Sequence, residues 1–196
     1  MLRFIGFYDY TVILTYLSLV SAVTGITAAS RGSLHAAVLC LLFSGICDAF
    51  DGMVARTKKN RTEDEKAFGI QLDSLCDVVS FGVFPAMICY FMGINGIVGM
   101  VILYAYCLCA LIRLAFFNVL EGKRQKTEGG CNKTYRGLPV TSISMVFPLV
   151  YLLRFVLPEQ IFLIVMQAVM AASAFLFVLD FSVKKPDWTK LFRSKK

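Results

Sequence analysis

Four aspartates stand at spacings that could gather them into a single acidic site. Asp48 and Asp51 are three residues apart, and Asp73 and Asp77 are four residues apart. Side chains at either spacing lie on one face of a helix. The segment between the two pairs is short, so the two helices should be antiparallel neighbours whose acidic faces can meet. We therefore expect the four carboxylates to converge.

Converging carboxylates need positive charge among them. Near a membrane interface they would repel one another and lose hydration unless cations compensated them. Arg56 is close in sequence, but one guanidinium cannot neutralise four acids. Oxygen ligands held at helical spacing suit Mg²⁺ or Mn²⁺ rather than Zn²⁺. Two such ions could clamp phosphate oxygens, so the pattern predicts a two-metal site that acts on a phosphorylated substrate.

The alternative is that these aspartates are helix caps or solvated loop residues. That interpretation suits Asp73 best, because it follows the short segment from Gly69 to Leu72. It does not suit all four together, since acids inside an apolar helix are functional by default. The nearby run from Glu63 to Glu65 is different and is typical of a solvated helical turn.

Two glycines flank the acids. Gly52 follows Asp51 directly, and Gly69 precedes Asp73 by one helical turn. Glycine removes a side chain where a diphosphate or a ribose must approach the backbone. The alternative is close helix packing, which glycine also serves in membranes.

The elements that carry these residues read as membrane-spanning helices. Of the 196 residues, 58% are apolar and only 17% are charged, which is more apolar surface than a soluble chain of this length could bury. A crossing helix needs about 20 apolar residues. We therefore expect an all-α integral membrane protein, one transmembrane catalytic domain over residues 1–196. Its six spans are expected at about 10–30, 33–55, 70–92, 96–119, 137–156 and 160–180.

The basic residues predict the orientation. Seventeen lysines and arginines lie in the two termini and in the loops 56–68 and 121–136, against two, Arg31 and Arg154, on the opposite side. Because such residues resist translocation, both termini and the acidic site should be cytoplasmic. The net charge of +7 then reflects topology and contact with anionic membrane lipids rather than nucleic acid. A prokaryotic plasma membrane is the expected location.

Histidine and cysteine offer no competing chemistry. The seven cysteines contain no C-x-x-C pair, and six lie in or beside spans, where cysteine packs as a small apolar residue. The single histidine, His35, falls on the outer side. A zinc site and a histidine-activated nucleophile are therefore not expected.

The order D-x2-D-G-x2-A-R-x12-G-x3-D-x3-D, from Asp48 to Asp77, resembles the signature of the CDP-alcohol phosphatidyltransferases. That family usually has about eight residues between the arginine and the second glycine, and the longer polar loop here would add about one helical turn. The resemblance implies attack of an acceptor hydroxyl on CDP-diacylglycerol with release of CMP, and a homodimer. It also implies that all four aspartates ligate the two ions, that Asp77 takes the hydroxyl proton, and that the donor pocket is lined by Gly52, Ala55, Arg56 and Gly69.

Segments outside the signature are similar to the phosphatidylserine synthases of the small bacterial and archaeal type. They are Ser80-Phe81-Gly82 with Pro85, RLAFFN from Arg113 to Asn118, and Gly137-Leu138-Pro139 after Tyr135-Arg136. The subgroup commonly has a second arginine where Phe116 stands. The implied acceptor is L-serine.

The carboxylate of serine needs a cation. Arg113 is the first candidate, because a buried arginine without a partner is costly, and Arg136 is the second. Arg113 could equally pair with one of the aspartates. Ser80 and Asn118 could supply polar contacts to serine, or they could join helices to one another.

Three other functions remain open from the sequence. The same fold could use glycerol 3-phosphate or inositol phosphate as its acceptor, although a dianionic phosphate should require a denser basic pocket. The aspartates could instead form the ion site of a cation transporter, although the outer halves of the spans are almost devoid of polar residues. A purely structural membrane protein is the third possibility.

Overall fold

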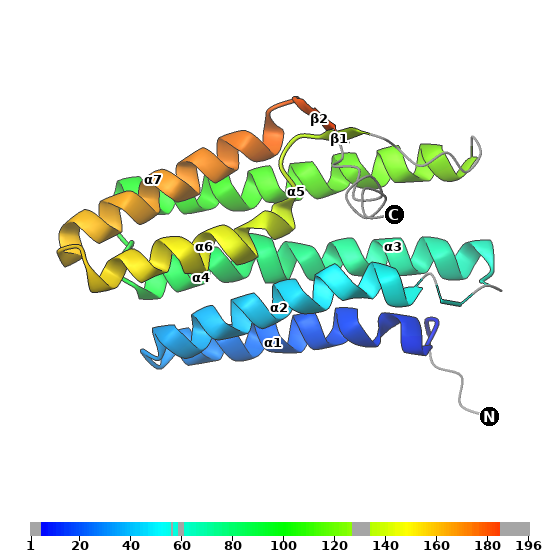
Figure 1. Ribbon diagram of the computed structural model, residues 1–196, viewed down its shortest axis with the longest axis horizontal. Coiled ribbons are helices and arrows are strands. Elements are labelled where there is room, and N and C mark those ends of the chain that lie inside the picture. Colours follow the sequence, from blue (N-terminus) through cyan, green and yellow to red (C-terminus); the bar gives the residue numbers. More distant parts are fainter. Residues whose placement is uncertain (1–4, 56, 59–60, 127–133, 185–196) are drawn as a thin grey trace, which may run out of the picture.

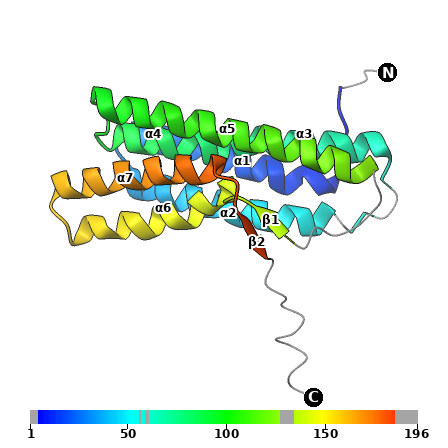
Figure 2. The same ribbon diagram turned by 90° about the horizontal axis from the view of Figure 1, so that it is seen from above.

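The computed structural model describes residues 5–55, 57–58, 61–126 and 134–184. The helices run side by side along one long axis and form a bundle (Figures 1 and 2). In chain order the elements are η1 (Tyr10–Val12), α1 (Ile13–Ser30), α2 (Leu34–Ala55), α3 (Glu63–Asp77), η2 (Val78–Val83), α4 (Phe84–Phe91), α5 (Ile97–Lys126), β1 (Thr134–Arg136), η3 (Val140–Ser142), α6 (Ile143–Tyr151), η4 (Leu152–Phe155), α7 (Glu159–Val178) and β2 (Ser182–Lys184).

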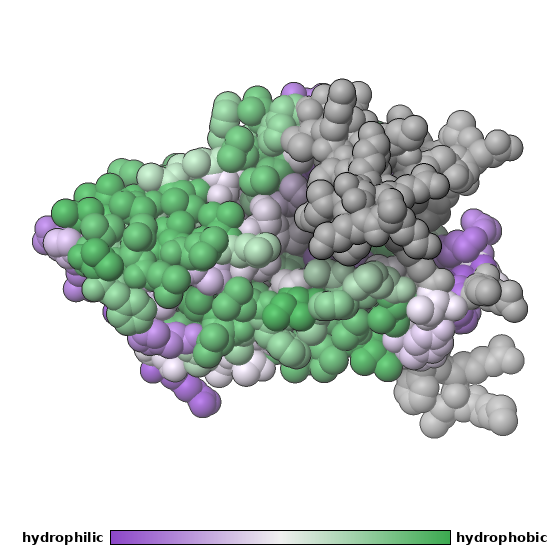
Figure 3. All heavy atoms as spheres, viewed as in Figure 1, coloured by the Kyte–Doolittle hydropathy of each residue, from purple (hydrophilic) through white to green (hydrophobic). Residues whose placement is uncertain are grey.

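Among the described residues, five helical segments are long and apolar enough to cross a membrane. They are Tyr10–Ser30, Leu34–Ala55, Glu63–Phe91, Ile97–Gly122 and Glu159–Val178. The apolar helix Val140–Phe155, where the sequence predicts another span, is shorter. The face drawn in Figure 3 is largely hydrophobic, and hydrophilic residues gather towards the two ends of the long axis. The chain is therefore a multi-pass membrane protein.

Left-handed glycines make the tight reversals between spans. Gly32 has a φ of +81° after α1, and Gly93 has a φ of +116° after α4. At each turn a backbone N–H one residue further on reaches back to the helix, from Ser33 to the Ala28 carbonyl and from Ile94 to the Cys89 carbonyl. This is the usual glycine-terminated helix end.

The helix that carries the third predicted span begins before the apolar run. The Thr62 side chain accepts from the Glu65 N–H, and the Glu65 side chain accepts from the Thr62 N–H. This reciprocal capping satisfies the first free amide groups of α3 and starts the helix at Glu63. The charged run from Glu63 to Glu65, which the sequence predicts as a solvated helical turn, is the first turn of this helix.

A π-helical stretch, η2, follows Asp77 directly and joins α3 to α4. Pro85 has no N–H to give to the carbonyl of Phe81, four residues earlier. The Tyr106 hydroxyl of α5 donates to that carbonyl at 2.6 Å. Tyr106 and Phe81 are both fully buried, so α5 satisfies the polar group that the proline leaves open.

A small two-stranded sheet, which the sequence does not predict, joins the segments after α5 and α7. β1 and β2 are antiparallel, with Tyr135 opposite Val183. The Gly137 N–H extends the pairing to the Phe181 carbonyl at 2.6 Å.

The fold brings several chain segments to one end of the bundle. The beginning of α1, the end of α2, the beginning of α3 and the end of α5 all lie there (Figure 1). The first three of these segments and Glu121 of α5 enclose the candidate site.

Candidate functional site

The two aspartate pairs meet across α2 and α3. The side chains of Asp48 and Asp77 are within hydrogen-bonding range of each other, and so are those of Asp51 and Asp73. Because the helices are antiparallel, the first pair lies one turn deeper in the bundle than the second. Asp77 is 7% exposed. The convergence that the helical spacing predicts is therefore present.

The carboxylate oxygens are placed to share a cation. One oxygen from each of Asp48, Asp73 and Asp77 lies within 4.8 Å of the other two. Asp73 also has a buried oxygen, Oδ1, with no hydrogen-bond partner among the described residues. Acids this close repel unless positive charge lies between them, and an orphaned carboxylate oxygen suits a hard dication. The residues fit Mg²⁺ or Mn²⁺.

Asp51, the fourth acid, is anchored by α1. The Thr15 hydroxyl donates to Asp51 Oδ2 at 3.2 Å, and Thr15 itself is buried. The backbone N–H of Gly52 also bonds to the Asp51 carboxylate. These two donors orient the carboxylate of Asp51, as hydrogen-bond partners of a metal ligand commonly do.

A polar cavity of about 420 Å³ opens beside Asp51 and Asp73. Asp51 and Asp73 line it, together with three of the four residues expected to bind the CDP-lipid: Gly52, Ala55 and Gly69. The fourth, Arg56, lies outside the described residues. Thr11, Val12 and Thr15 close the cavity on the side of α1.

The two glycines have different surroundings. A Cβ on Gly52 would meet nothing within 4 Å, so this position leaves the cavity open. A Cβ on Gly69 would lie 2.7 Å from Nη2 of Arg61. The space that Gly69 leaves is therefore occupied by a guanidinium of the same cavity wall.

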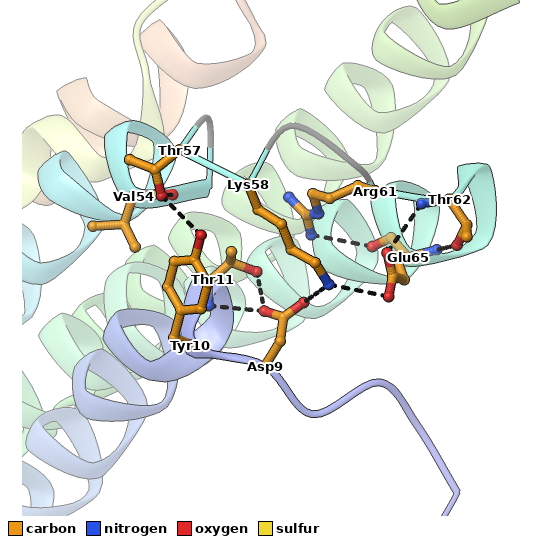
Figure 4. A network of polar contacts seen from close by, with 9 residues as sticks. All are labelled: Asp9, Tyr10, Thr11, Val54, Thr57, Lys58, Arg61, Thr62 and Glu65. Atoms are coloured by element: carbon orange, nitrogen blue, oxygen red, sulfur yellow. Dashed lines mark hydrogen bonds and ion pairs between the residues drawn. The ribbon is translucent and has the colours of Figure 1, made fainter.

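Three described cations also line the polar cavity: Lys58, Arg61 and Lys66. Lys58 pairs with Asp9 at 2.9 Å and with Glu65 at 3.1 Å. Lys66 pairs with Glu63 at 2.7 Å. Arg61 donates to the Glu65 carbonyl at 3.2 Å, and within the described part of the chain it has no carboxylate partner (Figure 4).

The segment before α1 is fastened to the loop between α2 and α3. Asp9 accepts from the Thr11 N–H and hydroxyl and pairs with Lys58 of the loop, while the Tyr10 hydroxyl lies 3.1 Å from the Thr57 hydroxyl (Figure 4). The Thr11 hydroxyl and the Lys58 ammonium hold the pKa of Asp9 at about 2, below its usual 3.8. Asp9 is therefore a carboxylate at neutral pH.

One helical turn deeper in the bundle than Asp48 and Asp77, three hydroxyls connect three helical elements. Ser18 on α1 lies 3.1 Å from the Ser44 hydroxyl on α2 and donates to Ser80 of η2 at 3.4 Å. All three serines are buried. The sequence allowed two roles for Ser80, contact with the substrate serine or a hydrogen bond between helices. The contact that the structure shows is the hydrogen bond between helices.

Arg113 lies in a second cavity, of about 290 Å³, whose lining contains none of the four aspartates. Its Nε donates to the Leu138 carbonyl at 3.2 Å, and Asp180 interacts with it electrostatically. Along α5, Arg113 lies between Asn118 and Tyr106. Asn118 is hydrogen-bonded to Ser74 of α3, and Tyr106 is hydrogen-bonded to Phe81 of η2. Arg113 is therefore at about the depth of Asp77 but faces another cavity.

The other two residues proposed for serine lie on separate elements. Asn118 Oδ1 accepts from the Ser74 hydroxyl at 2.7 Å, which ties α5 to α3. Arg136 is in β1, where its backbone is opposite Ser182. Asn118 is not among the described residues that line the polar cavity.

Sequence reasoning missed Thr15, Lys58 and Arg61. The sequence predicts only the orientation from the two cations, although their position next to the aspartate signature also indicates a role at the site. Thr15 has no signal in the sequence, since one threonine in an apolar helix usually bonds within its own helix, as Thr24 does to the Val20 carbonyl.

The family comparison agrees with this geometry. Residues 10–179 match the family model described as CDP-alcohol phosphatidyltransferase. The match covers most of the chain, from the beginning of α1 to the end of α7. The chain belongs to the CDP-alcohol phosphatidyltransferase family, a family of enzymes.

Several curated relatives carry related names. The archaetidylserine synthase of Methanothermobacter thermautotrophicus is 38% identical over 148 residues, which is 73% of this chain and 58% of the relative. The CDP-diacylglycerol–serine O-phosphatidyltransferase of Saccharomyces cerevisiae is 41% identical over 113 residues, 56% of this chain and 40% of the relative. Its namesake from Bacillus subtilis is 33% identical over 115 residues, 58% of each chain. The matched part thus spans about half the length of these relatives.

Proposed function

We propose that this protein is a phosphatidylserine synthase, which transfers the phosphatidyl group of CDP-diacylglycerol to the hydroxyl of L-serine and releases CMP. The observation that carries the proposal is the cluster of oxygens from Asp48, Asp73 and Asp77 within 4.8 Å, beside a cavity lined by the glycines of the family signature. The names of the three relatives support serine as the acceptor.

The chemistry follows from the positions of the acids. Two dications, when held by the four aspartates, would supply positive charge to the diphosphate. Asp77 takes the proton of the serine hydroxyl, the oxygen bonds to the phosphorus that carries diacylglycerol, and the bond from that phosphorus to CMP breaks. Thr15 orients Asp51. Asp51, Gly52 and Gly69 all line the polar cavity, in which the cytidine diphosphate would bind.

For the acceptor, Arg113 is the proposed partner of the serine carboxylate and Arg136 the second candidate. Arg113 is 8% exposed and at about the depth of Asp77, but it lines a separate cavity, so serine would have to lie between the two cavities for its hydroxyl to reach Asp77. A guanidinium forms strong charge-assisted hydrogen bonds with a carboxylate. Ser80 and Asn118 stay weaker proposals for contacts with serine, because each already makes an interhelical hydrogen bond.

The charges of the described residues that line the polar cavity favour serine over a phosphorylated acceptor. Lys58 and Lys66 are engaged by Asp9, Glu65 and Glu63. A dianionic acceptor would need free cations in addition to those that serve the donor diphosphate. Serine has no net charge, so its binding needs fewer additional cations.

The cavity and core also favour an enzyme over a cation transporter. Beyond the hydroxyls of Ser18, Ser44 and Ser80, most of the described core is apolar, with Leu41, Phe84 and Ile88 fully buried. The next buried hydroxyl on α1, that of Ser21, donates to the Cys40 carbonyl at 2.9 Å. Along that part of the described bundle, no acidic side chain is buried that could ligate a transported ion.

The wider arrangement is proposed on the same basis. Val140–Phe155 would make the sixth crossing, with both termini and the active site in the cytoplasm of a prokaryotic cell. Sixteen helical residues span about 24 Å, so the three residues before them would complete the passage. A single catalytic domain that forms a homodimer is the expected assembly.

An acceptor panel tests the proposal. Purified protein is incubated with CDP-diacylglycerol, Mg²⁺ or Mn²⁺, and serine, glycerol 3-phosphate or inositol phosphate in turn, and CMP and the lipid product are measured. We expect CMP and phosphatidylserine when serine is the acceptor, and no CMP with either of the other two acceptors. CMP with glycerol 3-phosphate but not with serine would reassign the acceptor, whereas metal flux into proteoliposomes without any CMP would favour the transporter.

A further inference from the structure

Arg61 differs from the other described cations of the polar cavity. Lys58 and Lys66 each contact a carboxylate, but Arg61 contacts none among the residues that the structure describes. Its Nη2 donates to a backbone carbonyl, that of Glu65. Its Nε is buried and lacks a hydrogen-bond partner in the same described part. A buried N–H of a charged group without a partner is costly, which indicates that a ligand satisfies it.

The surroundings of Arg61 hold the guanidinium against the cavity. The hydrogen bond to Glu65 fixes one end of the fork within the first turn of α3 (Figure 4). Gly69, one turn beyond Glu65, provides the room, since any side chain there would begin 2.7 Å from Nη2. The absence of a Cβ at position 69 therefore serves the arginine.

We propose that Arg61 is a further donor-binding residue, whose guanidinium, next to Gly69, binds the diphosphate of the CDP-lipid in the cavity that Asp51 and Asp73 also line. This inference rests on the proposed function and extends it. A planar guanidinium can give two parallel hydrogen bonds to phosphate oxygens. The diphosphate would then be held between the dications at the carboxylates and the guanidinium at Gly69.

The proposal gives Gly69 a second role that can be tested. If Gly69 serves to admit Arg61, then Gly69→Ala displaces the guanidinium and weakens donor binding only when Arg61 is present. If Gly69 instead lets the diphosphate approach the backbone, its replacement harms donor binding whatever stands at position 61. A double-mutant cycle separates the two cases.

The experiment measures KM for CDP-diacylglycerol and for serine in wild type, Arg61→Gln, Arg61→Lys, Gly69→Ala and the Arg61→Gln, Gly69→Ala double variant. We expect Arg61→Gln to raise the donor KM about tenfold or more, with the serine KM unchanged. Arg61→Lys should recover part of the loss, and the double variant should equal Arg61→Gln. Arg31→Gln removes the same charge at the opposite end of the bundle and should leave both constants unchanged.

Binding of CDP, measured by calorimetry, gives a readout that needs no turnover. Weaker CDP binding in Arg61→Gln with an unchanged unfolding temperature supports the inference. An active wild type whose donor KM and CDP affinity are unaffected by Arg61→Gln overturns the inference and leaves the proposed function intact. Fully additive losses in the double variant overturn the link to Gly69. A wild type that releases no CMP with any acceptor contradicts the proposed function itself.

Discussion

Thr15 on α1 donates a hydrogen bond of 3.2 Å to Asp51 on α2, and it is the contact by which the first helix reaches the acidic site. Through it, a residue outside the aspartate signature orients one of the expected metal ligands. The contact also places the wall formed by Thr11, Val12 and Thr15 against the polar cavity.

Thr15→Val should weaken metal binding. Valine keeps the volume of the side chain and removes the donor to Asp51, and loss of such an orienting partner typically costs about tenfold or more in metal affinity. The measurement is the Mn²⁺ concentration that half-restores CMP release in metal-stripped protein. Thr24→Val is the matched control, because Thr24 is exposed and bonds only to the Val20 carbonyl of its own helix. Equal Mn²⁺ requirements in the two variants would contradict the role of Thr15.

Asp77→Asn should lower kcat at least about a hundredfold, because it removes the proposed general base together with a metal ligand. Asp64→Asn makes the same change on an exposed residue of the same helix and should retain activity. Both proteins should unfold at similar temperatures, since the cost falls on the chemical step. Wild-type rates in Asp77→Asn would leave the acidic cluster without the role assigned to it.

The fastening of the N-terminal segment should depend on acid pH. The pKa of Asp9 is lowered from 3.8 to about 2 in the folded protein, so its stabilising contribution is complete above about pH 4 and is lost as the pH falls towards 2. We expect hydrogen-exchange protection of the Thr11 amide to fall across that window. Asp9→Asn should show reduced protection without this pH dependence. Protection in wild type that persists unchanged well below pH 2 would be inconsistent with the ion pair to Lys58.

Ser80→Ala should affect stability more than acceptor binding. It removes a hydroxyl bonded to Ser18 between two helices, which is worth about 1 kcal/mol in a membrane bundle. The unfolding temperature should therefore fall, while the KM for serine changes less than about twofold, a small change on the scale of one hydrogen bond. A large rise in that KM at unchanged stability would instead support direct contact between Ser80 and the substrate.

Much of the site could be predicted because it depends on local spacing. Asp48 with Asp51, and Asp73 with Asp77, share helix faces by the geometry of the helix alone, and a short loop forces the faces together. The helical turn from Glu63 to Glu65 is likewise predicted, and the capping pair Thr62 and Glu65, also visible in the sequence, accounts for where α3 begins.

What could not be predicted depends on contacts between distant segments. The bond from Thr15 to Asp51, the position of Arg61 over Gly69 and the separate cavity of Arg113 all require the packed bundle. The β1–β2 pairing has no clear strand pattern, because each strand has only three residues. Hydropathy locates apolar runs, but it does not report where a side chain points within them.

The central claim is that the four aspartates act through shared dications, and CMP release by metal-stripped protein tests it most directly. With CDP-diacylglycerol and serine present, we predict no CMP in the presence of a chelator and a saturable recovery when Mn²⁺ is added back. Undiminished CMP release by the metal-stripped protein would contradict the account.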